Sequence, residues 1–167
     1  MAIILEGCDC TGKTTFAKKL AEKTGFEIVK GSSFEISKLG ADEMYQFMFD
    51  LLKRKDVIID RLYLSNLIYG AKYDYPMMTE EQYASLSDMT NLFSLVVYLY
   101  APVSVIQHRM LKRGDDMIEI EDIEDILNRY NEALYGEFRP RTILSIDTSL
   151  IDIDKATNMV KELYKVI

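Results

Sequence analysis

The sequence predicts an α/β fold in which a parallel β-sheet is covered by helices on both faces. Five apolar runs of strand length alternate with longer stretches of helical periodicity, the pattern of strands buried on both sides. A glycine-containing turn follows the first run directly. Because the 167 residues contain no repeat, low-complexity tract or linker, we expect a single domain spanning residues 1–167.

The first half of the chain predicts three strands and two helices. The apolar run at 2–6 is closed by Gly7, and the helix that begins at Lys13 ends at Gly25, a typical C-cap residue. Strands are expected at 26–30 and 56–60. Between them a helix is predicted at 41–54 from the apolar stripe Met44, Phe47, Met48, Leu51 and Leu52.

The second half repeats the alternation. Its clearest strand is SLVVYLYA, and a fifth strand is TILSID. The predicted elements, in order, are helices at 62–71 and 79–93, a strand at 94–101, helices at 102–113 and 121–135, a strand at 142–147 and a helix at 152–166. Ligands of such sheets bind beyond the carboxyl ends of the strands, where Gly7 and Asp60 both fall.

Charge and hydropathy exclude several classes of protein. The net charge of −7 argues against a general nucleic-acid binder, but it is compatible with a small anionic ligand held by a few cations. The amino-terminal residues lack the pattern of a signal peptide. The longest apolar run contains Pro102 and is too short to span a bilayer. We therefore expect a cytoplasmic protein with neither nucleic acid nor membrane as a partner.

The first turn is the most informative motif. Gly7-Cys8-Asp9-Cys10-Thr11-Gly12-Lys13-Thr14 fits G-x-x-x-x-G-K-[ST], a loop whose backbone N–H groups cradle phosphate oxygens ahead of a helix N-terminus. In that motif Lys13 reaches the β- and γ-phosphates and Thr14 binds Mg²⁺. The sequence thus predicts ATP and Mg²⁺ as ligands. The predicted nucleotide-binding residues are Gly7, Cys8, Asp9, Cys10, Thr11, Gly12, Lys13, Thr14 and Thr15.

The two cysteines lie inside this loop, which raises the alternative of a metal or redox pair. A zinc site needs about four ligands, and His108 is the only histidine. Redox pairs normally have the spacing C-x-x-C rather than C-x-C. We interpret Cys8 and Cys10 as small side chains at variable loop positions. A thiol acidified by the helix N-terminus would still make the protein sensitive to oxidation or alkylation.

Three segments resemble known kinases. ILEGCDCTGKTTFAKKLAE resembles the opening of thymidylate kinases and, more loosely, that of deoxynucleoside kinases. VIIDRLYLSNLIYG is similar to the thymidylate kinase pattern D-R-Y-x-x-S-x-x-A-Y-Q, and VVYLYAPVSVIQHRMLKRGDD to the segment that leads into the lid. The resemblance implies a P-loop kinase fold with a five-stranded parallel sheet, a small lid at about 110–124, and ATP-dependent phosphorylation of a nucleotide or nucleoside.

The resemblance also implies roles for individual residues. Lys13, Asp60, Arg61 and Arg113 would be catalytic, and Thr14 and Asp60 would hold Mg²⁺. Arg109 would contact the ATP phosphates. The acceptor would be bound by Asp9, Arg61, Ser65 and Tyr69. The alternatives are a surface ion pair for Asp60-Arg61, a solvated basic face for Arg109 and Arg113, and a core or interface position for Tyr69.

Other segments depart from these families. VKGSSFEIS has neither the T-R-E-P-G-G of thymidylate kinases nor the acid-proline of deoxynucleoside kinases, although Glu35 is a candidate for the acid. Cys10 leaves the loop without an arginine. The run at 115–125 is acidic and is interpreted as a solvated helix start. A catalytic arginine would then be Arg109, Arg113 or Arg129.

Three functions follow from these patterns. Asp9 and the D-R-x-x-x-S-x-x-x-Y pattern favour a nucleoside monophosphate kinase of the thymidylate kinase type. A deoxynucleoside kinase is the alternative, and an acidic base near Glu35 would favour it. The third is a nucleotide-binding NTPase without a small-molecule acceptor, and the sequence has no N-K-x-D guanine motif. The sequence does not specify the base, the sugar or the oligomeric state, for which a homodimer is one option.

Overall fold

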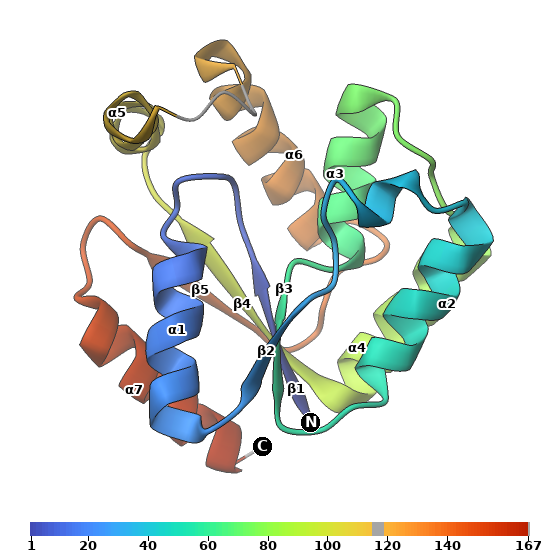
Figure 1. Ribbon diagram of the computed structural model, residues 1–167, viewed down its shortest axis with the longest axis horizontal. Coiled ribbons are helices and arrows are strands. Elements are labelled where there is room, and N and C mark those ends of the chain that lie inside the picture. Colours follow the sequence, from blue (N-terminus) through green and yellow to red (C-terminus); the bar gives the residue numbers. More distant parts are fainter. Residues whose placement is uncertain (115–118, 167) are drawn as a thin grey trace.

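The computed structural model describes residues 1–114 and 119–166. Within them, five parallel strands form one sheet in the order β2-β3-β1-β4-β5. Helices cover both faces of this sheet (Figure 1). The predicted α/β fold with a five-stranded parallel sheet is confirmed.

Every predicted strand and helix is present, with ends that differ by at most two residues from the prediction. The strands are β1 (Ala2–Glu6), β2 (Glu27–Lys30), β3 (Val57–Asp60), β4 (Ser94–Tyr100) and β5 (Ile143–Asp147). The helices are α1 (Lys13–Thr24), α2 (Ala41–Leu52), α3 (Tyr63–Tyr73), α4 (Glu80–Phe93), α5 (Val103–Arg113), α6 (Ile123–Tyr135) and α7 (Ile153–Val166). Two short 3₁₀ helices, η1 (Ile36–Lys38) and η2 (Ile120–Asp122), were not predicted.

Neighbouring residues of β1, β3, β4 and β5 belong to two separate cores. In β1, Ile3 and Leu5 pack with α1 and α7, whereas Ala2 and Ile4 belong to the larger core formed with α2, α3, α4 and α6. Figure 1 shows α1 and α7 on one face of the sheet and α2, α3 and α4 on the other. Burial on both faces explains why the strands read as continuous apolar runs.

The strand register brings polar side chains together at one edge of the sheet. Asp60 pairs with Leu5 on one side and with Lys30 on the other, and Glu6 pairs with Tyr98. Because all the strands are parallel, these residues lie at the same carboxyl edge. The phosphate-loop motif leaves β1 at this edge, so the sheet itself positions the candidate site.

The predicted lid falls between α5 and α6. Helix α5 ends at Arg113. After the gap, the described residues begin again at Glu119, just before η2. Residues 115–118, which belong to the predicted lid, lie outside the described residues. In the part of the chain that is described, no helix is both long enough and apolar enough to cross a membrane.

Candidate nucleotide-binding site

A cleft of about 680 Å³ opens at the carboxyl edge of the sheet. Its walls come from the phosphate loop, the ends of β2 and β3, and helices α3 and α5. This volume is within the usual range for small-molecule sites. The described charged side chains that line it are Lys13, Lys30, Arg61, Arg109, Arg113, Asp9 and Asp60. Five cations therefore face two carboxylates, in a protein whose net charge is −7.

The phosphate loop has the backbone that its motif requires. Gly7 has φ +143°, and a Cβ there would collide with the carbonyl oxygen of Leu99. Gly12 has φ +90° and stands at the N-cap of α1 without a capping side chain, so the first N–H groups of the helix face the cleft. The Thr11 hydroxyl donates to the Cys8 carbonyl at 2.7 Å and closes the turn from inside.

Lys13 is folded against its own loop. Its Nζ donates to the carbonyl oxygens of Gly7 at 2.8 Å and Cys8 at 2.6 Å, and the residue is 7% exposed. Burial, followed by the nearby charge of Arg61, lowers the pKa of Lys13 to about 8. An anionic group in the cleft would compensate this desolvated cation, as the phosphates of a nucleotide would.

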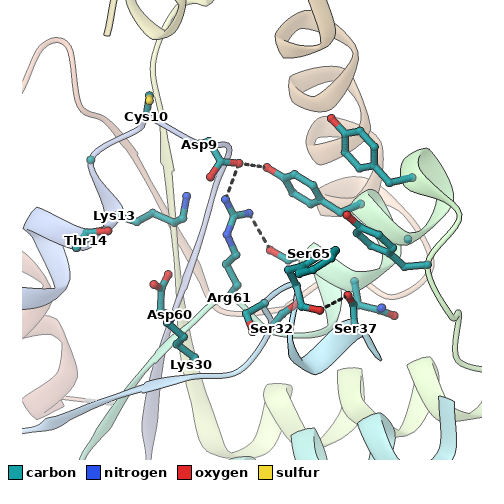
Figure 2. A pocket seen from close by; sticks show the side chains of 18 of the residues that line it. Asp9, Cys10, Lys13, Thr14, Lys30, Ser32, Ser37, Asp60, Arg61 and Ser65 are labelled. Atoms are coloured by element: carbon teal, nitrogen blue, oxygen red, sulfur yellow. Dashed lines mark hydrogen bonds and ion pairs between the residues drawn. The ribbon is translucent and has the colours of Figure 1, made fainter. Parts of the chain in front are cut away.

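The two cysteines differ in environment. Cys8 is fully buried, and burial together with the charge of Asp9 raises the pKa of its thiol to about 11, the opposite of the acidification considered from the sequence. Cys10 lines the cleft with φ +57° and lies at the tip of the loop (Figure 2). Both are free thiols.

Asp9 and Arg61 form an ion pair in the wall of the cleft. Arg61 Nη2 lies 2.9 Å from Asp9 Oδ2, and the Tyr69 hydroxyl donates to the same oxygen at 2.9 Å (Figure 2). The guanidinium also lies 4.8 Å from the centre of the Tyr69 ring. Burial disfavours the ionised form of Asp9, but the charges of Arg61 and Lys13 prevail and lower the pKa of its carboxyl. Arg61 is therefore part of the cleft rather than of a surface ion pair.

Behind Arg61 lies a buried polar cluster of Glu6, Ser65 and Tyr130, of which only Ser65 was predicted as a site residue. Glu6 is 1% exposed and accepts hydrogen bonds from the Leu62 N–H at 2.9 Å and the Ser65 hydroxyl at 2.6 Å. Burial raises the pKa of Glu6, although these two hydrogen bonds oppose the rise. The Tyr130 hydroxyl, from α6, joins the same cluster at 3.2 Å from Glu6 Oε2. The predicted substrate residue Ser65 thus faces both the cleft and this cluster.

Asp60 ends β3 below Lys13 and beside Lys30 (Figure 2). Its Oδ1 is buried and has no hydrogen-bond partner among the described residues. A buried carboxylate oxygen without a partner is unusual, and together with the Thr14 hydroxyl on the cleft wall it would supply oxygen donors of the kind that Mg²⁺ prefers. The residues present therefore fit the predicted magnesium ion. Lys30, which the sequence analysis missed, lines the same wall.

The arginines of α5 line the cleft, and Arg109 contacts the phosphate loop. Arg109 donates to the Thr148 hydroxyl at 3.0 Å, to the Thr148 carbonyl at 2.9 Å and to the Cys10 carbonyl at 3.3 Å. It thus ties the phosphate loop to the loop after β5, instead of belonging to a solvated basic face. Arg113 also lines the cleft. Arg129, the third candidate for a catalytic arginine, is paired with Asp125 and is absent from the lining.

Two expectations about acidic residues change. Glu35 is exposed beside η1 and does not line the cleft, so the structure gives no support for it as a base. Asp122 and Asp125 are not simply solvated, because Lys72 of α3 binds both, at 2.9 and 2.8 Å. Ion pairs to Lys72 therefore connect the acidic start of α6 to α3.

Most of the predicted site residues line the cleft, and three do not. Gly7, Cys8 and Thr11 are buried within the loop, where their contribution would be through the backbone. The predicted residues on the wall are Asp9, Cys10, Gly12, Lys13, Thr14, Thr15, Asp60, Arg61, Ser65, Tyr69, Arg109 and Arg113.

Comparison with solved structures places the fold among the P-loop kinases. The chain superimposes on M. mycoides deoxyadenosine kinase with bound dCTP with a TM-score of 0.65 at 19% identity, each chain being covered completely. Shikimate kinase from Acinetobacter baumannii gives a TM-score of 0.60 at 17% identity, over 99% of this chain and 93% of the other. Together with the phosphate loop, this likeness shows that the chain has the P-loop kinase fold.

Nearer relatives identify the family. The uncharacterized SPbeta prophage-derived protein YorR of Bacillus subtilis strain 168 is 44% identical over 133 residues, 79% of this chain and 81% of YorR. The crystal structure of Bacillus subtilis YorR in complex with phosphorylated GDP has a TM-score of 0.91 at 38% identity, over 99% of this chain and 96% of that one. This chain therefore belongs to the YorR family.

A more distant relative carries an assigned activity. Deoxyguanosine kinase of Bacillus subtilis strain 168 is 27% identical over 176 residues, 87% of this chain and 85% of that enzyme. No protein-family model matches the sequence. These relatives do not include the thymidylate kinases that the motifs resemble. The comparisons therefore support a P-loop kinase family, but not the thymidylate kinase subclass.

Proposed function

We propose that the protein transfers the γ-phosphoryl group of ATP to a nucleoside or deoxynucleoside monophosphate, with Mg²⁺ as cofactor. The observation that carries the proposal is the charge of the cleft, in which five cations face two carboxylates. An ATP-Mg²⁺ complex and a monophosphate together bring several negative charges into one site. The nucleotide ligand of YorR and the deoxynucleoside kinase among the relatives support a nucleotide as the ligand.

The donor would lie on the phosphate loop. The N–H groups at the start of α1 and the Lys13 ammonium would hold the β- and γ-phosphates, and Arg109 and Arg113 would approach them from α5. Mg²⁺, held through Thr14 and Asp60, would supply the charge neutralisation that phosphoryl transfer needs.

The acceptor would lie on the other side of the cleft. Arg61, whose guanidinium can bind a phosphate bidentately, and Lys30 would receive its phosphate. Beyond them a row of aromatic side chains offers ring faces to a nucleobase. Neighbouring ring centres in this row are 6.1–6.2 Å apart, along Tyr69, Tyr73, Tyr75 and Phe34.

The second candidate is a deoxynucleoside kinase, which the likeness to deoxyguanosine kinase favours. A nucleoside 5′-hydroxyl has to lose a proton, so this reaction calls for a base, whereas a phosphate acceptor is already a nucleophile. Among the described residues the cleft offers only Asp9 and Asp60 as carboxylates. Asp9 already accepts from Arg61 and Tyr69, and Asp60 would be engaged with Mg²⁺, which favours the monophosphate.

A substrate panel tests the proposal. The purified protein is incubated with ATP and Mg²⁺ and with each nucleoside, deoxynucleoside and corresponding 5′-monophosphate in turn, and ADP and the phosphorylated product are quantified. We expect at least one monophosphate to be converted faster than its nucleoside. Conversion of nucleosides alone would overturn the proposal in favour of a deoxynucleoside kinase. ATP hydrolysis that no acceptor accelerates would indicate an NTPase.

A further inference from the structure

Arg61 is connected to the buried carboxylate of Glu6 through two hydroxyl groups. Arg61 Nη1 donates to the Ser65 hydroxyl at 3.3 Å and to the Tyr130 hydroxyl at 3.2 Å. These hydroxyls are 2.9 Å apart and lie 2.6 and 3.2 Å from Glu6 Oε2. Tyr130 is 0% exposed and Glu6 1%, so water does not compete for these contacts.

The direction of the hydrogen bonds follows from the chemistry of the groups. A guanidinium can only donate and an ionised carboxylate can only accept, while a hydroxyl does both. Each hydroxyl can therefore accept from Arg61 and donate towards Glu6, which bridges a buried cation and anion that have no direct contact. In a low-dielectric interior such a chain is oriented by both charges at once.

The other oxygen of Glu6 holds the backbone of the same arginine. Arg61 has φ +63°, a left-handed conformation that costs a non-glycine residue energy. Two hydrogen bonds fix this turn: Arg61 N–H donates to the Leu5 carbonyl at 2.9 Å, and Leu62 N–H donates to Glu6 Oε1 at 2.9 Å. Both oxygens of Glu6 thus act on Arg61, one through the main chain and one through hydroxyls.

We propose that Tyr130 and Glu6 are positioning residues that place the guanidinium of Arg61 for the acceptor. This inference rests on the proposed function in so far as Arg61 receives the acceptor. Tyr130 comes from α6, 69 residues away in sequence from Arg61, and brings that helix into the geometry of the acceptor side. Its hydroxyl also lies 3.2 Å from the Gly7 carbonyl, which Lys13 satisfies independently at 2.8 Å.

The test is Tyr130→Phe, which removes the hydroxyl and keeps the ring. We expect the KM for the acceptor to rise about tenfold while the KM for ATP changes less than about twofold, because one hydrogen bond to a charged group is lost. Tyr63→Phe is the matched control. Tyr63 is equally buried, but its hydroxyl donates to the Phe138 carbonyl at 2.7 Å, so both KM values should stay unchanged.

A merely structural role would give a different result. It would lower the melting temperature in both variants without separating the two KM values, and that outcome would overturn the inference. Glu6→Gln removes the charge, and its effect on the acceptor KM should be less than additive with Tyr130→Phe, because the two residues act on one group.

A readout independent of activity separates this inference from the proposed function. In a crystal structure of Tyr130→Phe, the Arg61 guanidinium should be displaced from its position beside Asp9. An unmoved guanidinium would contradict the inference whatever the substrate is. Were the wild-type protein to phosphorylate nucleosides only, the proposed function would fail, while the same displacement would still support the positioning role.

Discussion

Asp9 and Arg61 form an ion pair of 2.9 Å that joins the phosphate loop to the end of β3. The side chain of Arg61 is 15% exposed and that of Asp9 29%, so the pair lies in the wall of the cleft with limited access to water. A partly buried pair of this kind is costly to break from one side, because the remaining charge loses its partner. The phosphate loop and the end of β3 are therefore electrostatically coupled.

Replacing Arg61 should affect the acceptor more than ATP. In Arg61→Ala we expect the KM for the acceptor to rise by about tenfold to a hundredfold, since charge-assisted hydrogen bonds to a phosphate are lost, while the KM for ATP changes by less than about threefold. Steady-state kinetics with each substrate varied in turn measures both. Arg54→Ala, which removes a surface arginine paired with Glu27, is the control. An effect confined to ATP would show that Arg61 serves the donor.

Removing the ammonium of Lys13 should abolish transfer while the fold persists. Lys13→Met keeps the length of the side chain but removes the charge that, in the proposed function, would contact the phosphates, so we expect the rate to fall about a hundredfold or more. Circular dichroism should remain that of the wild type. Lys18→Met, at an exposed position of the same helix, should retain full activity. Wild-type activity in Lys13→Met would contradict the proposed role of Lys13 in phosphoryl transfer.

Asp60→Asn should raise the Mg²⁺ concentration needed for half-maximal activity about tenfold. The substitution keeps the shape but weakens the oxygen donor that has no partner among the described residues. A titration of activity against Mg²⁺ at saturating ATP measures the change. Asp56→Asn, just before the other end of the same strand, where Asp56 accepts from the Tyr164 hydroxyl, is the control. Equal Mg²⁺ requirements in the two variants would contradict the assignment.

The lowered pKa of Lys13 predicts how ATP binding depends on pH. The free protein loses the Lys13 proton above about pH 8, whereas bound phosphates would favour the charged form and raise this pKa. Binding then takes up a proton above pH 8, so the affinity should fall by up to about tenfold per pH unit there and stay level between pH 7 and 8. Calorimetric titration with ATP at several pH values measures this. Lys13→Arg, which stays charged, should bind with little pH dependence.

The same shift has the opposite sign for folding. The pKa of Lys13 lies at about 8 in the folded protein against an ordinary value of 10.5. Between these values the unfolded chain holds the proton and the folded chain does not, so the free energy of unfolding attributable to this group rises with pH from about 8 to 10.5. Thermal melts of the wild type and Lys13→Met should diverge in this window, with the variant showing the flatter profile.

The strands, the helices and the phosphate loop could be predicted because their signals are local. An apolar run ending at Gly7 and a helix beginning at Lys13 are legible within a few residues, and the rule that parallel strands share a carboxyl edge placed Asp60 beside the loop. The pairing of Asp9 with Arg61 was within reach of the same rule. It depends only on two strand ends that lie next to each other.

The buried cluster could not be predicted in the same way. Tyr130 reaches Glu6 across 124 residues of sequence, and this contact depends on how α6 packs against α3. Glu6 could be recognised in the resemblance, but its buried position and its partners could not. The exposure of Glu35 likewise depends on η1, a short 3₁₀ helix that left no periodic signal.

Arg61 has a left-handed backbone, although this conformation is unfavourable for any residue other than glycine. An L-residue with φ near +60° costs about 1–2 kcal/mol that glycine does not. A glycine at this position would relieve the turn, but it would also lose the guanidinium and leave Asp9 without its ion-pair partner, so we expect no gain in melting temperature. The protein thus keeps a locally unfavourable conformation in the middle of a rigid sheet edge, where relaxation of the backbone cannot release it without moving the cation.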